Sequence, residues 1–213
     1  MLDRFKAFWQ GVVLAPIINL LIALKVSPDT VTLVGTLGVA GGALGFYPRG
    51  ELFWGTVVIT CFVFSDLVDG AMARKVGRTP GASTFGSFWD STLDRIGDGA
   101  IFGALVLYYA GPGDDGLYLG LSLWCVVMGS VTSYARAKAE SIGLDAHVGI
   151  AERADRLVAI LVMTGLSGLF TDWGWSWGHW LMEITLWALA IASTITVVQR
   201  VWVVRRQALA LDA

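Results

Sequence analysis

Long apolar segments follow one another along almost the whole 213-residue chain. A helix needs about 20 mostly apolar residues to cross the hydrocarbon core of a bilayer. The composition agrees with membrane insertion, because 55% of the residues are hydrophobic and only 15% are charged, against about 25% charged in soluble domains. We therefore expect an all-α integral membrane protein with six transmembrane helices, at Val31–Tyr47, Leu52–Ala73, Phe88–Ala110, Leu117–Ala137, Arg153–Phe170 and Trp177–Val204.

The segment before these spans combines charged and aromatic side chains. Leu2–Trp9 alternates them in the way that is typical of a helix lying in the membrane interface. Residues 1–26 are thus expected to be a juxtamembrane amphipathic segment of a single domain that covers residues 1–213. Ser27–Thr30 then reads as a capped start of the first span. Two glycine pairs in that span predict close helix packing: Gly38-x3-Gly42 and Gly41-x3-Gly45.

Basic residues are distributed unequally between the expected connections. With six spans, one side of the membrane receives both termini and the loops 74–87 and 138–152, and every Lys and Arg except Arg49 falls there. Positively charged residues stay on the cytoplasmic side. The sequence therefore predicts a multi-pass protein of the cell membrane with both termini cytoplasmic. The Trp-rich turn 172–180 on the opposite side is typical of an interfacial aromatic belt, with ligand binding as the alternative.

Four aspartates interrupt the apolar pattern. Asp66 and Asp69 close the second span, and Asp90 and Asp94 lie near the start of the third. An ionised carboxylate costs several kcal/mol in an apolar medium unless it is paired or binds a metal. Residues three or four apart share one helix face, and clustered carboxylates suit a hard ion such as magnesium. We expect a metal site on a cytoplasmic hairpin of these two helices, and consider helix caps or arginine partners the alternative.

Neighbouring residues add to this candidate site. Gly70 leaves bare backbone beside the carboxylates, and Arg74 lies one turn further on, where its guanidinium can contact a phosphate. The loop 75–85 is expected to join the two helices. Asp98 continues the second face, either as a neighbour of the metal site or as a structural partner of Arg95.

The residue pattern resembles a known family. Asp66-x2-Asp69-Gly70-x2-Ala73-Arg74-x11-Gly86-x3-Asp90-x3-Asp94 is similar to the signature of the CDP-alcohol phosphatidyltransferases, which are integral membrane enzymes that join a CDP-linked lipid to an alcohol and release CMP. The resemblance extends to the six-span layout, so it covers most of the chain. One departure is the longer spacing between Arg74 and Gly86, and an insertion in a connecting loop is tolerated.

The resemblance implies a set of roles for these residues. Metal binding falls to Asp66, Asp69, Asp90 and Asp94, and Asp94 also acts as the general base. The cytidine diphosphate group of CDP-diacylglycerol contacts Asp69, Gly70, Ala73 and Arg74. Two Mg²⁺ (or Mn²⁺) ions neutralise the pyrophosphate and stabilise the charge that develops as CMP leaves. The resemblance also implies membrane lipid as a partner, a homodimer, and no nucleic-acid partner.

A second group of residues bears on the acceptor alcohol. Five basic side chains are expected on the same membrane side as the aspartates: Arg136, Lys138, Arg153, Arg156 and Arg200. They suit a phosphorylated acceptor, while membrane anchoring is the alternative. The runs 134–140 and 152–156 resemble the phosphatidylinositol-phosphate synthases of actinobacteria, which use inositol phosphate. Glycerol 3-phosphate is also anionic, so a phosphatidylglycerophosphate synthase stays open.

Two other functions bind magnesium through acidic residues. Membrane prenyltransferases use Asp-rich helices, but they carry Asn before the first Asp and more spans, whereas Ser65 precedes Asp66 here. A magnesium transporter would place acids along a pore and on several spans. The prenyltransferase hypothesis leaves Gly70-x2-Ala73-Arg74 unexplained, and the acids here are expected at one cytoplasmic hairpin, unlike those of a transporter. Both are therefore the weaker hypotheses.

Overall fold

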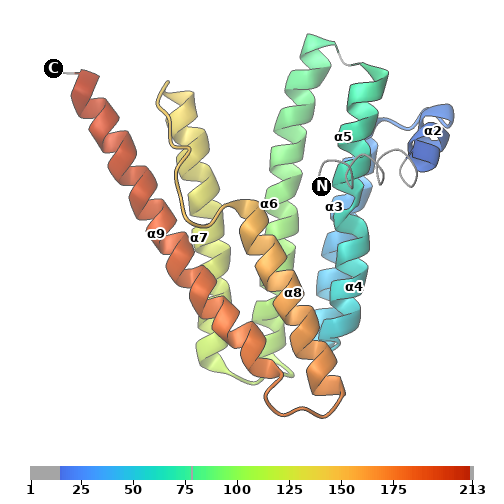
Figure 1. Cartoon of the computed structure of the whole chain (residues 1–213), viewed down its shortest axis with the longest axis vertical. Coiled ribbons are helices and arrows are strands. Elements are labelled where there is room, and N and C mark those ends of the chain that lie inside the picture. Colours follow the sequence, from blue (N-terminus) through green and yellow to red (C-terminus); the bar gives the residue numbers. More distant parts are fainter. Residues whose placement is uncertain (1–14, 78, 212–213) are drawn as a thin grey trace, which may run out of the picture. The chain divides into compact units, whose positions relative to one another are not determined.

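The computed structural model describes residues 15–77 and 79–211, apart from the side chain of Asp66. Every regular element in these ranges is a helix (Figure 1). Most of the predicted N-terminal amphipathic segment lies outside the described residues, and α2 is its described part. The elements are α2 (Ala15–Ala23), α3 (Pro28–Phe46), the short 3₁₀ helix η2 (Tyr47–Arg49), α4 (Leu52–Val63), α5 (Ser65–Val76), α6 (Pro80–Ala110), α7 (Gly116–Ser141), α8 (Arg153–Asp172) and α9 (His179–Leu211).

Five helical stretches in the described chain are long and apolar enough to cross a membrane: Pro28–Arg49, Leu52–Val76, Gly116–Ser141, Arg153–Asp172 and His179–Leu211. This is the composition of a multi-pass membrane protein. The expected span within α6 is not among them, so the count of six is not confirmed. Every 18-residue window of α6 contains Asp94 and Arg95 together with Asp90 or Asp98. The polar residues of the candidate site thus lower the apolar character of the helix that carries them.

The chain divides into two compact units, and each is described by itself. The first unit is Met1–Gly41 with Val58–Gly97, and the second is Gly42–Val57 with Asp98–Ala213.

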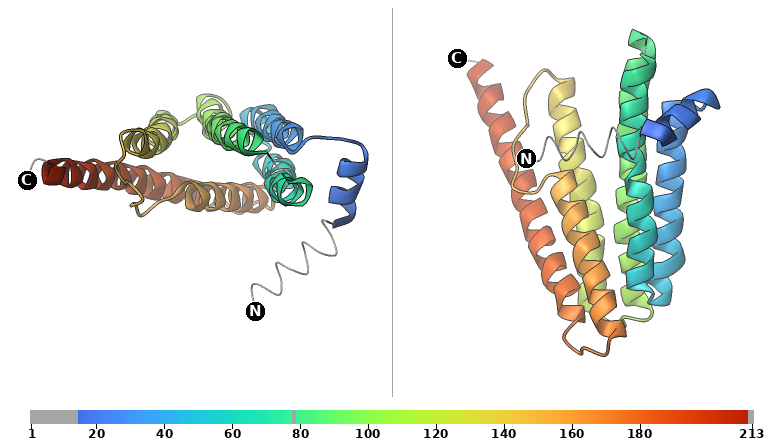
Figure 2. Two further views of the ribbon diagram at one scale, coloured as in Figure 1. Left: turned by 90° about the horizontal axis from the view of Figure 1, so that it is seen from above. Right: turned by 45° about the vertical axis from the view of Figure 1, so that its right-hand side comes forward.

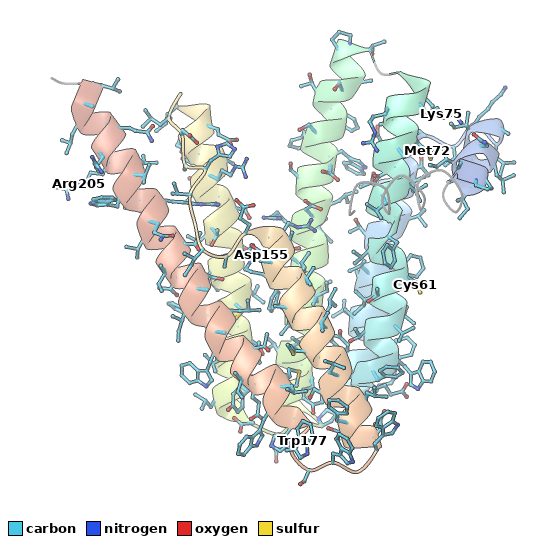
Figure 3. The ribbon with its side chains drawn as sticks, in the orientation of Figure 1. Cys61, Met72, Lys75, Asp155, Trp177 and Arg205 are labelled. Carbon is cyan, nitrogen blue, oxygen red and sulfur yellow. The ribbon has the colours of Figure 1, made fainter. Side chains whose placement is uncertain are left out.

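In the first unit, α2 packs against α5. Ile18 of α2 is buried with Val68 and Met72 of α5. Lys75 of α5 donates a hydrogen bond to the side-chain oxygen of Asn19 on α2, and Figure 3 shows Met72 and Lys75 along α5. Apolar burial and a polar contact together hold α2 beside α5.

The start of α3 is capped as the sequence predicts. The Ser27 hydroxyl accepts a hydrogen bond from the backbone N–H of Thr30 at 3.1 Å, and Pro28 is the first residue of the helix. A cap of this kind satisfies one of the backbone N–H groups that a helix start leaves without a partner.

Close packing of α3 in the first unit agrees only in part with the predicted glycine pairs. A Cβ at Gly35 would lie 1.8 Å from Oγ of Ser65, and one at Gly38 would lie 2.2 Å from the Phe62 ring. The prediction is thus confirmed for Gly38. It is wrong for Gly41, where a Cβ would meet none of the described atoms within 4 Å. The contact face of α3 is rotated from the expected one.

In the second unit, α9 packs against both α7 and α8, and Figure 2 shows α8 and α9 running side by side. Apolar side chains such as Ile160 and Leu186 are fully buried there. The Trp124 indole N–H on α7 donates to Oγ1 of Thr194 on α9 at 3.1 Å. Glu152 and Asp155 form a capping box that starts α8.

The turn between α8 and α9 gathers aromatic rings, and Figure 3 labels Trp177 there. Phe170 stacks on Trp175 with ring centroids 5.0 Å apart, and Trp175 lies 5.3 Å from Trp177. Trp173 is also in the cluster and stays exposed. Exposed, mutually packed indoles are consistent with the predicted interfacial belt.

Candidate active site

The two pairs of aspartates lie on consecutive helices of the first unit. Asp66 and Asp69 belong to α5, and Asp90 and Asp94 belong to α6. The side chain of Asp66 is outside the described atoms. Asp69 is buried, Asp94 is half-buried and Asp90 is exposed. The hairpin predicted from the spacing is therefore present in the backbone.

The connection between α5 and α6 is much shorter than the expected loop 75–85. Gly77, with a φ of +73°, ends α5, and Pro80 already begins α6. The Thr79 hydroxyl accepts a hydrogen bond from the backbone N–H of Ala82 at 3.3 Å. Thr-Pro is a helix start, with a capping side chain followed by proline at the first helical position. The sequence contained this indication, but the glycines at 77 and 81 favoured a loop.

Asp69 has a partner that the sequence pattern did not indicate. The Thr32 hydroxyl on α3 donates to Oδ2 of Asp69 at 2.5 Å, and both side chains are buried. The same hydroxyl lies 3.1 Å from the carbonyl oxygen of Pro28. The contact fixes the orientation of the Asp69 carboxylate from a neighbouring helix. Only the three-dimensional packing of α3 on α5 reveals it.

The start of α3 also contacts α6, the helix that carries Asp90 and Asp94. The Trp89 indole N–H, next to Asp90 on α6, donates to the backbone oxygen of Asp29 at 3.2 Å. Phe85 stacks on Trp89 one turn earlier, with ring centroids 5.9 Å apart. The first two turns of α3 therefore contact both aspartate-bearing helices within the first unit.

Gly70 and Arg74 lie together as their spacing predicts. A Cβ at Gly70 would be 3.6 Å from Nη1 of Arg74, so the guanidinium lies over the bare backbone of the glycine. Arg74 is exposed, and Ala73 beside it is half-buried. This part of α5 thus offers a cationic group beside an uncovered stretch of helix, next to Asp69. A phosphate fits such a surface.

The donor set of the hairpin suits a hard divalent cation. Carboxylate oxygens are the ligands that Mg²⁺ and Mn²⁺ prefer, while zinc takes nitrogen and sulfur. Among the described side chains, no three Asp, Glu, His or Cys residues lie close enough to hold a metal ion together. The side chain of Asp66 is not among the described ones, and the backbone of Asp66 lies one turn before Asp69 on α5. The residue types fit the metal, and a complete cluster requires the Asp66 carboxylate.

The five basic residues predicted for the acceptor all belong to the second unit, in four different environments. Arg153 of α8 contacts Asp98 of α6, with 3.0 Å between Nε and Oδ1. Asp98 thus has a structural partner on another helix, which the sequence did not indicate. Lys138 is exposed near the end of α7.

Arg156 and Arg200 are both buried. The guanidinium of Arg156 lies over α7, because a Cβ at Gly129 would be 3.9 Å from its Nη2. Arg200 of α9 donates through Nη1 to the Thr132 carbonyl on α7 at 2.5 Å and through Nε to the Val148 carbonyl at 2.9 Å. Arg200 therefore connects α9 to α7 and to the loop that follows it.

Arg136 belongs to a polar network at the end of α7. Its Nε donates to Oε1 of Glu140 at 3.0 Å, and its Nη2 contacts Nε2 of His147. His147 in turn contacts Asp145, whose pKa is held below its ordinary value by hydrogen bonds from the backbone N–H and the side chain of His147. Sequence reasoning missed both residues of this pair.

The comparison with known families agrees with the aspartate spacing. A model of the CDP-alcohol phosphatidyltransferase family matches residues 25–198. The chain belongs to the CDP-alcohol phosphatidyltransferase family, so the predicted family is confirmed. The match includes both aspartate pairs and four of the five basic residues discussed above, and it ends two residues before Arg200.

Comparison with individual relatives identifies a more specific group of enzymes that the chain resembles. A phosphatidylinositol phosphate synthase of Streptomyces avermitilis is 52% identical over 214 residues, which cover 100% of this chain and 86% of the relative. The Mycobacterium tuberculosis phosphatidylinositol phosphate synthase with CDP-DAG bound superposes with a TM-score of 0.80 at 37% identity, covering 90% of this chain and 93% of that one. The same enzyme in complex with manganese and citrate gives a TM-score of 0.81 at 39% identity, covering 90% and 88%. The predicted resemblance to the actinobacterial enzymes is therefore confirmed.

Proposed function

We propose that the protein transfers the phosphatidyl group of CDP-diacylglycerol to a hydroxyl of inositol phosphate, giving phosphatidylinositol phosphate and CMP. The main support is the pair of consecutive helices that carry Asp69, Gly70 and Arg74 on one and Asp90 and Asp94 on the other. This arrangement occurs in a chain that is 52% identical, over its full length, to a phosphatidylinositol phosphate synthase.

The metal-binding residues of this proposal are Asp66, Asp69, Asp90 and Asp94. Two Mg²⁺ or Mn²⁺ ions, when bound, would neutralise the pyrophosphate and stabilise the charge that develops on the leaving phosphate oxygen. The manganese in a relative of 39% identity supports a divalent ion. Thr32 contributes by holding one oxygen of Asp69, which limits the orientations of that carboxylate.

In this proposal, residues of α5 bind the nucleotide of the donor lipid, and a residue of α6 activates the attacking hydroxyl. Gly70 and Ala73 let the nucleotide approach the helix, and Arg74 contacts its phosphate. Asp94 accepts the proton of the attacking hydroxyl, because a carboxylate near the reacting oxygen serves as a general base. CDP-DAG bound to the relative of 37% identity supports this choice of donor.

The acceptor's phosphate is assigned to the basic residues of the second unit. Arg136 and Lys138 bind it directly, since both lie at the cytoplasmic end proposed for α7. Arg153, Arg156 and Arg200 add positive charge, and their contacts with Asp98, Gly129 and the Thr132 carbonyl keep that charge in fixed positions. Fixed cations favour an anionic acceptor over a neutral one.

The proposal includes a membrane arrangement. The segment Phe88–Ala110 of α6 forms a sixth span in this proposal, so both termini and the aspartates face the cytoplasm of the cell membrane. The bias of Lys and Arg along the chain supports this orientation. The enzyme acts as a homodimer in this proposal.

A transfer assay tests the function. The purified protein is incubated with CDP-diacylglycerol, Mg²⁺ or Mn²⁺, and in parallel with radiolabelled inositol phosphate, free inositol, glycerol 3-phosphate or serine. We expect CMP release and lipid product with inositol phosphate only. Equal or better turnover of glycerol 3-phosphate would make the protein a phosphatidylglycerophosphate synthase, and no CMP with any acceptor would refute the transferase.

A further inference from the structure

His147 lies in the loop 142–152 that follows α7, next to Arg136, and Figure 1 shows this loop running to the start of α8. Nδ1 of His147 lies 2.6 Å from Oδ1 of Asp145, and the backbone N–H of His147 donates to the same oxygen at 2.8 Å. Nε2 of His147 contacts Nη2 of Arg136 and lies 3.7 Å from Oε1 of Glu140. All four side chains belong to the second unit and face solvent at least in part.

The backbone around His147 is held by α9. Gln207 accepts a hydrogen bond from the backbone N–H of Asp145 at 2.9 Å and donates to its carbonyl at 2.6 Å. Arg200 donates to the carbonyl of Val148 at 2.9 Å. The residues on either side of His147 are thus anchored, and the imidazole has a defined place to which Arg136 can bind.

The chemistry of the contacts fixes the direction of each hydrogen bond. An ionised carboxylate only accepts, so the ring hydrogen of His147 lies on Nδ1 and points at Asp145. A guanidinium only donates, so Nε2 accepts from Arg136. The contact therefore needs the neutral Nδ1–H tautomer, which the Asp145 carboxylate selects. Glu140 and His147 then hold Nε and Nη2 of Arg136 from two different elements.

We propose that His147, oriented by Asp145, is a positioning residue that aims Arg136 at the phosphate of the acceptor. A guanidinium fixed in its plane loses less freedom when it binds a phosphate than one that must be ordered first. This inference rests on the proposed function, because it takes Arg136 as a ligand of the acceptor. His147 acts through Arg136 and touches no reacting atom.

A pair of isosteric variants tests the inference. Gln in place of His147 keeps an acceptor near the position of Nε2, whereas Asn keeps the donor to Asp145 but does not reach Arg136. We expect H147N to raise the KM for inositol phosphate about three- to tenfold, with kcat and the KM for CDP-diacylglycerol unchanged. H147Q should stay within about twofold of the unsubstituted enzyme. Equal effects of H147Q and H147N, or no effect of H147N, would overturn the inference.

The R136A variant separates this inference from the proposed function. R136A alone should raise the KM for inositol phosphate about tenfold or more. H147N added to R136A should change nothing further, because His147 acts only through Arg136. A further rise in the double variant overturns the positioning role while Arg136 keeps its own. If R136A leaves the KM unchanged, the acceptor role of Arg136 itself fails, and the inference fails with it.

Discussion

The Thr32 hydroxyl donates a hydrogen bond to Oδ2 of Asp69 at 2.5 Å, and both side chains are buried. The hydrogen bond joins the first turns of α3 to the aspartate-bearing part of α5. A carboxylate proposed to hold a metal is thereby oriented by a residue that itself contributes no charge. Outer partners of this kind commonly change metal affinity by about 10- to 100-fold when removed.

Thr32→Val should weaken metal binding. Valine keeps the volume but removes the donor to Asp69, so the Mg²⁺ concentration for half-maximal activity should rise about 10- to 100-fold. Thr32→Ser keeps a hydroxyl and is the matched control. Metal titration of CMP release checks this prediction, and an unchanged metal requirement in T32V would contradict the orienting role.

Asp94→Asn should separate chemistry from substrate binding. Asparagine keeps the shape of the side chain but accepts no proton, and loss of a general base costs about 10²- to 10⁴-fold in rate. We expect turnover to fall by that factor while CDP-diacylglycerol binding, measured by equilibrium binding in detergent micelles, stays largely intact. If binding is lost as well, Asp94 is primarily a metal ligand.

Gly35→Ala should destabilise the protein. The new Cβ would lie 1.8 Å from Oγ of Ser65, so α3 and the residues around Ser65 must separate. Overpacking of this kind costs about 1–3 kcal/mol. Thermal unfolding in detergent measures it, with G41A as the control, because a Cβ at Gly41 meets no described atom within 4 Å. Equal melting temperatures for the two variants would refute the close approach at Gly35.

Asp98→Ala should destabilise the second unit. The substitution removes the carboxylate that lies 3.0 Å from Nε of Arg153, a pair whose side chains are 16% and 30% exposed. Loss of such a hydrogen-bonded pair costs about 1–3 kcal/mol. Arg205→Ala, at an exposed position, is the control.

A double variant shows whether the loss of stability in D98A arises from the contact between Asp98 and Arg153. D98A and R153A together should cost less than the sum of the single changes, because both remove the same contact. Strict additivity in thermal unfolding would show that Asp98 and Arg153 stabilise the protein independently.

Several features of the fold and the site follow from local sequence patterns. The apolar segments predicted the long helices because bilayer thickness sets their length, and the three- and four-residue spacings placed the aspartates in pairs on α5 and α6. The Arg74–Gly70 contact followed from the same helical period. These predictions depend on neighbours within one or two helical turns, where geometry leaves little freedom.

Other features depend on how helices pack, which the sequence alone does not determine. The Thr32–Asp69 contact joins residues 37 positions apart, and the Asp98–Arg153 pair joins residues 55 apart. Which glycines of α3 pack closely depends on the rotation of that helix about its axis, and Gly35 was overlooked for this reason. The early start of α6 at Pro80 could have been read from Thr79-Pro80, but two nearby glycines obscured it.

Hydrogen bonds to α9 hold the backbone of the loop 142–152 at three points. Thr196, Arg200 and Gln207 lie along one stripe of α9 and hold Ala151, Val148 and Asp145 of the loop in turn. Ordering a loop of this length on binding would cost conformational entropy at every residue. Because contacts with α9 already restrain this loop in the folded protein, an acceptor that bound to Arg136 as proposed would keep most of its interaction energy as affinity. Under this proposal, α9 would contribute to the affinity for the acceptor without touching it.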